Sequence, residues 1–345
     1  MKEYFSAADL PEAWDDDLGD NIYMRRYFLR FMEGRSDNTD ERRVAFEGAD
    51  GRLAERFVLF RRPDYVITQF TDTAVRMDTT FIHVPLSVSK PGIVMAGANG
   101  PASAHIRGLR GLKLVMNLPE AIRPRGFAQI RTCPRCVLHL RWNDFVGYMG
   151  SLRSAYRNRY KKALQRSALL TLRLLRDNRE FDEKLYGLYL QVHDKARYKV
   201  EKLKADFFRG DFFKIFVLES PEGAPVAFFQ LLENGPELIF EFAGMDYALA
   251  PRYDAYVRVL LEIVRYGIEN DFERIDFGQT AEDAKLKIGC VYEHLFVLAH
   301  HSNPFLNLLL KLCAPLLRYN PLKEDSFTVF KDTPKPCGES PGKAS

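Results

Sequence analysis

Glu241 is an ionisable side chain in an otherwise apolar segment. The other residues from 238 to 245 are Leu, Ile, Phe, Phe, Ala, Gly and Met, which is typical of a strand covered on both faces. A carboxyl group in such a place must be hydrogen-bonded or must have a raised pKa. A raised pKa would suit a general base that takes a proton from an amine. The alternatives are a structural carboxylate paired with an arginine, or a strand less covered than its sequence indicates.

Gln230 is a second polar residue expected near this carboxyl group. Two apolar strands, Pro225–Leu232 and Glu237–Met245, flank Asn234-Gly235, a dipeptide typical of a two-residue hairpin turn. In that register Gln230 faces Ile239, and its side chain lies diagonally opposite the carboxyl group on one face of the sheet. A slip of one residue would separate the two groups.

Polar residues also follow the next strand, Glu273–Gly278. Asp276, Gln279 and Lys285 lie at its end or just after it, and ligands commonly gather at strand ends. Asp276 has an alternative role as the cap of the helix Thr280–Lys287.

A basic stretch lies in the second half of an amphipathic helix that begins near Asn143-Asp144. Residues 153–166 contain six Lys or Arg residues and no acid, so this half could dock a phosphate-bearing carrier such as phosphopantetheine or tRNA. Arg157 and Lys161, one helical turn apart, are the pair to test first. Charge runs of this kind are usually the solvated face of a surface helix, and that interpretation is favoured.

Several other kinds of site are excluded. Cys133, Cys136 and His139 supply three potential metal ligands, but no second pair follows at zinc-ribbon spacing, so no metal site is expected. No nucleophile lies on a Gly-x-Ser-x-Gly turn, and the sequence contains neither a Walker loop nor Gly-x-Gly-x-x-Gly.

Length and composition indicate a globular protein of two domains. The chain has 345 residues, of which 46% are hydrophobic and 28% charged, and its net charge of +4 is too small to imply nucleic-acid binding by itself. Five scattered cysteines and an N-terminus without an apolar signal core favour a reducing, cytoplasmic location. No segment reaches the roughly 20 apolar residues of a membrane span.

The first domain, residues 1–141, is expected to be mixed α/β. A helix near Tyr23–Met32 precedes short strand-like runs separated by turn signals, and Ile122–Pro134, rich in proline and arginine, is interpreted as a linker. The expected strands are Arg42–Glu47, Leu53–Arg61, Tyr65–Phe70, Thr79–Val84, Gly92–Ala96 and Leu112–Asn117.

The second domain, residues 142–302, is expected to run strand, helix, helical turn, three antiparallel strands, helix, strand, helix and strand. A C-terminal helix and extension follow over 303–330. Leucines of Pro304–Arg318 could touch a membrane surface, although a helix that packs over the sheet is the favoured interpretation. The tail, 331–345, has three prolines and no aromatic residue and is expected to be disordered.

This order of elements resembles the GNAT acyltransferase fold. Three segments are similar to its BioF2-like or FemAB-like branch: 142–145 before the basic helix, 242–247, and 275–278 followed by Lys285 and Gly289. The resemblance implies an α/β chain of two GNAT-like halves, each a mostly antiparallel mixed sheet flanked by helices. It also implies a donor that enters between the fourth and fifth strands of a half.

The resemblance assigns further roles around the second strand of the hairpin. Gly244 would allow a bulge that points a backbone N–H at the thioester carbonyl, and Tyr256 is one of several tyrosines that could protonate the leaving thiolate. The donor would contact Met245, Tyr247 and Arg252 before the helix that Asp254 opens, together with the polar groups after residue 275. This turn lacks the glycines that normally hold coenzyme A pyrophosphate, and it carries an acid.

The resulting hypothesis is an N-acyltransferase that moves an acyl group from acyl-coenzyme A or acyl-carrier protein to an amine by direct attack. No permanently bound cofactor is expected. One alternative is a Fem-like transferase that uses aminoacyl-tRNA and acts on a cell-wall or lipid-linked precursor, with peripheral membrane contact. The other is a non-catalytic GNAT-like binding module.

Overall fold

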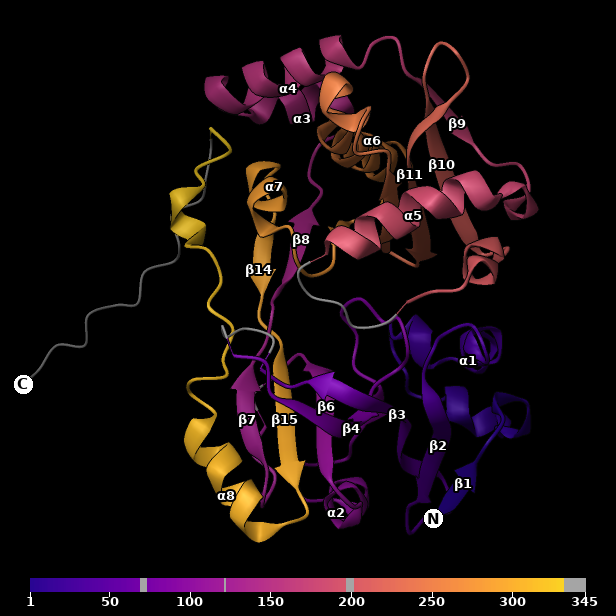
Figure 1. Cartoon of the computed structure of the whole chain (residues 1–345), viewed down its shortest axis with the longest axis vertical. Coiled ribbons are helices and arrows are strands. Elements are labelled where there is room, and N and C mark those ends of the chain that lie inside the picture. Colours follow the sequence, from indigo (N-terminus) through magenta and orange to yellow (C-terminus); the bar gives the residue numbers. More distant parts are fainter. Residues whose placement is uncertain (69–72, 121, 197–201, 332–345) are drawn as a thin grey trace, which may run out of the picture.

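The chain forms two halves, each built on one β-sheet, stacked along the long axis of the molecule (Figure 1). The structure is a computed structural model, and it describes residues 1–68, 73–120, 122–196 and 202–331. No helix in these residues is both long and apolar enough to cross a membrane.

The sheet of the N-terminal half has the strand order β1-β2-β3-β4-β6-β15-β7, and β5 pairs with β3. All neighbours are antiparallel except β4 and β6, which are parallel and are joined through helix α2 (Pro101–Gly108). Helix α1 (Arg26–Met32) follows a short 3-10 turn, Ile22–Met24. The strands are β1 (Lys2–Tyr4), β2 (Thr39–Glu47), β3 (Leu53–Val66), β4 (Arg76–Ile82), β5 (Ile93–Val94), β6 (Leu112–Leu118), β7 (Ala128–Arg131) and β15 (Phe296–His301).

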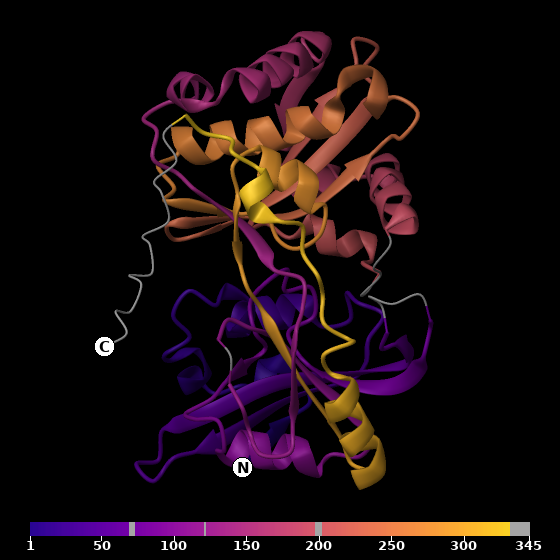
Figure 2. The same ribbon diagram turned by 90° about the vertical axis from the view of Figure 1, so that its left-hand side faces the viewer.

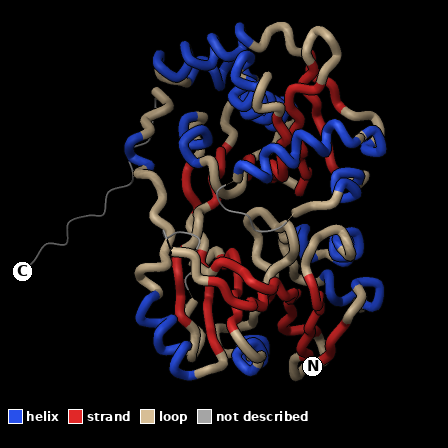
Figure 3. The backbone as a smooth tube through the Cα atoms, viewed as in Figure 1, coloured by secondary structure: helices blue, strands red, loops and turns tan. Residues whose placement is uncertain are grey.

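The sheet of the C-terminal half has the order β14-β8-β13-β12-β11-β10-β9. Its single parallel pair, β12 and β13, is joined through helix α6 (Ala255–Glu269), and helices lie on both of its faces (Figure 3). The strands are β8 (Arg135–His139), β9 (Thr171–Leu174), β10 (Phe213–Glu219), β11 (Pro225–Asn234), β12 (Glu237–Met245), β13 (Arg274–Asp276) and β14 (Val291–Glu293).

Both halves therefore share one pattern, in which an antiparallel meander ends in a parallel pair joined by a helix. This confirms the predicted α/β fold class, with two mostly antiparallel mixed sheets flanked by helices. Two strands cross the predicted boundaries. β8, before residue 142, lies in the C-terminal sheet, and β15, before residue 303, lies in the N-terminal sheet. The domain limits 1–141, 142–302, 303–330 and 331–345 stay a prediction about folding units.

The remaining helices begin at clear sequence signals. Asp144 and Asp182 accept backbone N–H bonds at the starts of α3 (Phe145–Ser151) and α5 (Glu183–Lys195). The expected single basic helix is instead two helices, because the chain breaks between α3 and α4 (Ser154–Arg166), where Leu152 bridges to Phe330 of the C-terminal extension. Two short helices complete the set, α7 (Glu282–Lys287) and α8 (Pro304–Cys313).

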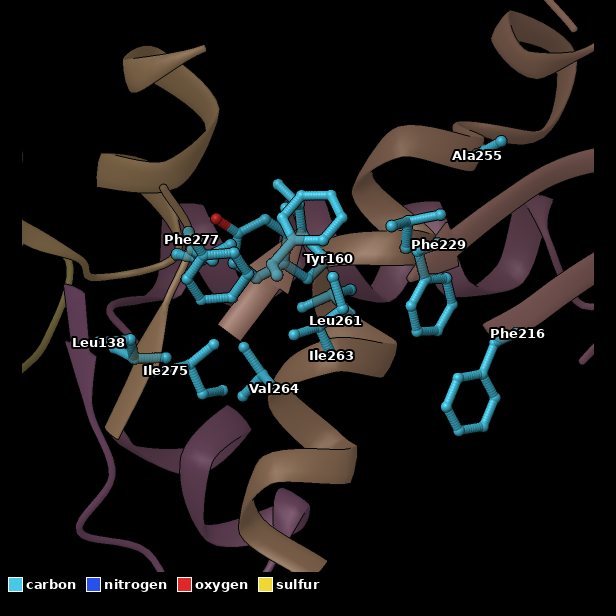
Figure 4. Close-up of a cluster of buried hydrophobic side chains, with 14 of the residues drawn as sticks. Leu138, Tyr160, Phe216, Phe229, Ala255, Leu261, Ile263, Val264, Ile275 and Phe277 are labelled. Atoms are coloured by element: carbon cyan, nitrogen blue, oxygen red, sulfur yellow. The ribbon is translucent and has the colours of Figure 1, made fainter. Parts of the chain in front are cut away.

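Two apolar cores cover the faces of the C-terminal sheet. The α6-side core includes Phe216, Phe229 and Ile275 packed around α6 (Figure 4). The α5-side core joins Phe228, Leu232 and Ile239 of the sheet to residues of α5 and of the N-terminal half, including Tyr23 and Trp14. The second core therefore ties the two halves together, because residues from both are buried in it.

Three sequence expectations of the N-terminal half are wrong. The supposed linker Ile122–Pro134 contains strand β7, and β3 continues through Val66, so no separate strand starts at Tyr65. Helix α2 was not expected at all. The C-terminal extension runs back from α8 to the C-terminal half (Figure 2). Lys331 bonds Ser151 there, and the predicted disordered tail beyond it lies outside the described residues.

Candidate active site

The opening between β12 and β13 is the feature expected to receive a donor. The two strands are neighbours over only three residue pairs, the last of which joins Ile239 to Asp276. β12 continues to Met245, whereas β13 ends at Asp276, and Phe277 and Gly278 after it bond Cys136 of β8 rather than β12. This edge of β12 is therefore unpaired with β13 beyond Ile239, and Glu241 lies just past the last pair.

The hairpin register differs from the prediction. Asn234 pairs with Glu237, so the turn residues are Gly235-Pro236, and Gly235 takes the positive φ of 58° that the turn requires. Ile239 faces Leu232 rather than Gln230. The sequence misled because Asn234-Gly235 is the stronger turn signal.

A β-bulge in β12 brings Glu241 back beside Gln230. Leu231 pairs with Phe240 and Gln230 pairs with Phe242, which leaves Glu241 as the extra residue. Along β11, Gln230 lies between Phe228 and Leu232, which both belong to the α5-side core. The Glu241 carboxyl group accepts a hydrogen bond from Tyr23 of that same core. Gln230 and Glu241 therefore lie on one face of the sheet, as expected. A bulge in β12, and not the predicted register, brings them together.

Glu241 is 6% exposed and is held by a tyrosine of the other half. The Tyr23 hydroxyl donates to Glu241 Oε1 at 2.6 Å, and Oε2 has no hydrogen-bond partner among the described residues. Burial raises the pKa of Glu241 to about 8; the Tyr23 bond opposes this shift, and the charge of Asp276 adds to it. This carboxyl group therefore combines a raised pKa with one oxygen that has no partner among the described residues.

Gln230 is fully buried, and neither polar atom of its amide group has a hydrogen-bond partner among the described residues. An unsatisfied buried amide costs stability, so native structures rarely keep one without a purpose. Together with Glu241 Oε2 it marks a buried polar spot on the α5 side of the sheet, where a polar ligand or water would find hydrogen-bonding partners.

Asp276 belongs to a charged network between the halves. Its carboxylate accepts the Gly278 N–H at 2.7 Å and an Arg135 N–H at 3.0 Å, and Ser89 Oγ of the N-terminal half also donates to it. Asp276 is fully buried, and its charge acts on the Glu241 pKa. Its predicted helix-capping role is not found, because Ala281 precedes α7 and no side chain caps that helix.

Glu237 is the second buried acid of this network. It accepts Lys90 at 2.7 Å, Arg274 at 2.8 Å and Arg135 at 3.4 Å. Burial alone would raise the pKa of Glu237, but these cations outweigh burial and lower it. A pocket of about 570 Å³ opens beside the network, and Asp20, Lys90 and Arg135 are among its lining residues.

Gly244 does not offer its own amide to the opening. Asp246 N–H donates to Val226 O across the β11–β12 ladder, and hydrogen-bonded pairs alternate along such a ladder. Gly244, opposite Phe228, is therefore directed to β11, while the amides of Ala243 and Met245 face the open edge. Gly244 is needed for packing, because an added Cβ would lie 2.2 Å from the Phe228 ring and 2.7 Å from a backbone nitrogen of α5.

Three other predicted residues lie around the turn before α6. Tyr256 is partly buried and packs with the α6-side core, so it lies on the other face of the sheet from Glu241, and burial raises its pKa well above the ordinary value. Lys195 of α5 lies 3.7 Å from the centre of the Tyr247 ring. Arg252 stacks near Tyr253, 5.4 Å from its ring centre.

Gln279 and Lys285 hold the backbone after β13. The Lys285 ammonium is buried and donates to Gln279 O at 2.7 Å, while the Gln279 amide donates to Cys133 O at 2.8 Å. Burial lowers the pKa of Lys285 and raises the pKa of Cys133 to about 12. These contacts are structural, and a donor-binding role for either residue stays a prediction.

The basic helix α4 lies along the outer side of the C-terminal half (Figure 1) and packs on the α6-side core, on the other face of the sheet from Glu241. Arg157 donates to Leu152 O at 3.0 Å, and Lys161 is exposed. At its end, Arg166 forms a 2.9 Å ion pair with Asp254, at the N-terminus of α6. The Asp254 carboxylate makes no capping bond to that helix.

Tyr23 and the cations Lys90 and Arg135 were missed by sequence reasoning. Tyr23 and Glu241 are 218 residues apart, and no local pattern links them. The only available signal was indirect, since a buried carboxyl group requires a partner and several aromatic residues of the first half could supply one.

Residues 150–286 match the family described as "Acetyltransferase (GNAT) domain", a span that contains β12, the bulge, α6 and β13. No curated protein matches the sequence.

Solved structures with a similar fold include L-PGS from Bacillus licheniformis, with 13% identity, a TM-score of 0.47, and coverage of 83% of this chain and 94% of that one. FemX has 10% identity, a TM-score of 0.48 and coverage of 79% and 90%. N-myristoyltransferase of Saccharomyces cerevisiae with bound myristoyl-CoA has 9% identity, a TM-score of 0.43 and coverage of 72% and 64%.

Proposed function

We propose that the chain is an acyltransferase that moves an acyl group from a thioester carrier to an amine with Glu241 as the general base; the match of residues 150–286 to the GNAT acetyltransferase family supports acyl transfer. The observation that carries this proposal is the buried Glu241 carboxyl group at the open edge of β12, with one oxygen bonded to Tyr23 and the other unpaired among the described residues.

The proposed step is direct attack of a neutral amine on the thioester carbonyl. The C–N bond forms, and the amine proton passes to Glu241 Oε2, directly or through one water. The tetrahedral oxyanion is stabilised by one backbone amide of the open edge, that of Ala243 or that of Met245. The C–S bond then breaks, and the thiolate leaves and takes a proton from solvent or from a tyrosine near the opening.

The surroundings of Glu241 set its protonation for this task. A base works best when its pKa is near the working pH, and burial with the nearby Asp276 charge brings the pKa of Glu241 to about 8. Tyr23 fixes the orientation of the carboxyl group through Oε1. In this proposal the N-terminal half thus positions the base, and the pocket beside Lys90 and Arg135 receives the polar part of the acceptor.

A transfer assay tests the proposal. The protein is incubated with acetyl- and long-chain acyl-coenzyme A and a panel of amines, and thiol release is followed. Glu241→Gln should lower kcat by about a hundredfold or more, the usual cost of losing a general base. The matched control is Glu233→Gln, because Glu233 also accepts a tyrosine hydroxyl, Tyr266 at 2.5 Å, but is exposed at the hairpin end. Equal rates for both variants would refute the base assignment.

An aminoacyl-tRNA donor is a second candidate, favoured by two observations. The Asp254 carboxylate lies at the helix start where a coenzyme A pyrophosphate would need positive charge. Arg159, Lys161 and Lys162 of α4 are exposed and form no ion pair among the described residues. Salt-dependent retention on tRNA, lost in Lys161→Glu/Lys162→Glu, would support this donor. Stabilisation by acyl-coenzyme A without tRNA retention would favour the thioester.

A further inference from the structure

Helix α8 presents apolar side chains to solvent on its outer side. Phe305, Leu308, Leu309, Leu312 and, just after the helix, Leu316 are between 48% and 76% exposed, and no residue of α8 is buried. These positions follow spacings of three, one, three and four residues, so they form one stripe. The favoured packing interpretation therefore explains only the inner side, where α8 contacts β15 and β7.

The surface beside α8 is strongly basic. Residues 101–131 and 296–320 contain eight Lys or Arg residues and a single acid, Glu120, whereas the whole chain has a net charge of only +4. None of the eight forms an ion pair among the described residues. Lys113 is buried, and the seven at the surface are Arg107, Arg110, Arg123, Arg125, Arg131, Lys311 and Arg318.

A pocket of about 590 Å³ lies between α8 and β7, and four of these cations line it: Arg123, Arg131, Lys311 and Arg318. No acid is among its lining residues. The pKa of His300 is lowered to about 4, first by burial and then by nearby positive charges. These charges belong to Lys113, Arg107, Lys311 and His301.

We propose that α8 and this pocket form a docking surface for a membrane containing anionic phospholipid. The exposed Phe and Leu side chains enter the boundary between headgroups and acyl chains, and the four cations bind lipid phosphates. An apolar stripe bordered by unpaired Lys and Arg residues has the chemistry of such an interfacial helix. The ten residues of α8 are too few to span a bilayer, so the helix lies on the membrane.

The geometry favours a lipid surface over a protein partner. The core of a protein interface is depleted in charged residues, whereas the phosphates of anionic headgroups complement all four pocket cations. The surface belongs to the N-terminal half, and α8 and the α4 basic helix lie at opposite ends of the molecule (Figure 1). The proposal is thus independent of the acyl donor, and its variants leave the Glu241 site untouched.

Vesicle flotation tests the proposal with the full chain. The protein should float with phosphatidylcholine vesicles that contain phosphatidylglycerol and not with phosphatidylcholine alone, and added salt should weaken binding. Lys311→Glu/Arg318→Glu should lower binding by roughly 25-fold or more, since each cation contributes about fivefold, or about 1 kcal/mol. The charge control is Lys161→Glu/Lys162→Glu on α4, which should bind as the unaltered protein does.

The apolar half of the surface has its own pair of variants. Leu312→Ser should lower vesicle binding by about tenfold, because a leucine inserted in the membrane contributes at least about 1.5 kcal/mol. Leu169→Ser is the matched control, since Leu169 and Leu312 are equally exposed at 68%. Circular dichroism and melting temperature should be unchanged for both variants.

Three outcomes would overturn the proposal. The first is equal flotation of the α8 and control variants. The second is a concentration-dependent dimer that Leu312→Ser abolishes while no vesicle binds, which would make the stripe a contact between copies of the chain. The third is a thermal shift with inorganic phosphate but no binding to phosphatidylglycerol vesicles, which would make the pocket a site for free phosphate.

Discussion

Replacing Glu241 by Gln should change how stability depends on pH. In the folded chain burial raises the pKa of Glu241 from the ordinary 4.5 to about 8. Between these values the folded state keeps the proton and the unfolded state has lost it, so the free energy of unfolding falls as pH rises. At about 1.4 kcal/mol for each tenfold change in proton concentration, the whole window amounts to about 5 kcal/mol.

The glutamine variant has no proton to lose and lacks this slope. Its free energy of unfolding, minus that of the unaltered protein, should therefore grow by about 3 kcal/mol between about pH 5 and pH 7. Taking this difference removes the contributions of every other titrating group, because they are common to both proteins. Urea unfolding followed by circular dichroism at several pH values measures it.

The control for this experiment is again Glu233→Gln, which removes an exposed carboxyl group from a tyrosine bond. Its difference from the unaltered protein should change less with pH than that of Glu241→Gln, because Glu233 is exposed. If the Glu241→Gln difference is flat, the carboxyl group is ionised in the folded state at neutral pH, and the reasoning from burial is refuted.

Three further predictions follow from single contacts. Tyr23→Phe removes the bond that lowers the pKa of the site carboxyl group, so the rising limb of the kcat/KM profile, which reports this base, should move to higher pH; an unmoved limb would contradict the pairing. Gly244→Ala should lower the free energy of unfolding in urea by about 2 kcal/mol or more, because the added Cβ would overlap a phenylalanine ring of β11. The control is Gly187→Ala in α5, where an added Cβ has no neighbouring atom within 4 Å. This change should be neutral or stabilising. Arg135→Ala leaves the buried Asp276 without its cation and should cost about 3 to 5 kcal/mol in the same assay, and a loss below 1 kcal/mol would mean that water replaces it.

Much of the C-terminal half was predictable because its signals are local. The apolar runs that became β10, β11 and β12 are bounded by turn residues, and the stripe of α6 repeats at helical spacing. The burial of Glu241 in β12 was predictable for the same reason, because its apolar neighbours in the sequence are enough to predict a covered strand.

The rest depended on contacts between distant segments. The bulge at Glu241 and the strand exchange of β8 and β15 are set by pairing partners far along the chain, which periodicity does not encode. Helix α2 was missed because Gly100-Pro101 at its start is also a turn signal, although Pro at a first helical position is common.

The pH dependence of kcat/KM tests the central claim most directly. It should be measured for acyl transfer to two amines whose own pKa values differ, so that the enzyme's base can be separated from the acceptor. Activity should rise with an inflection near pH 8, the pKa that burial gives Glu241, for both amines, and Glu241→Gln should remove that inflection. An inflection that follows the pKa of each amine and survives in Glu241→Gln would contradict the account.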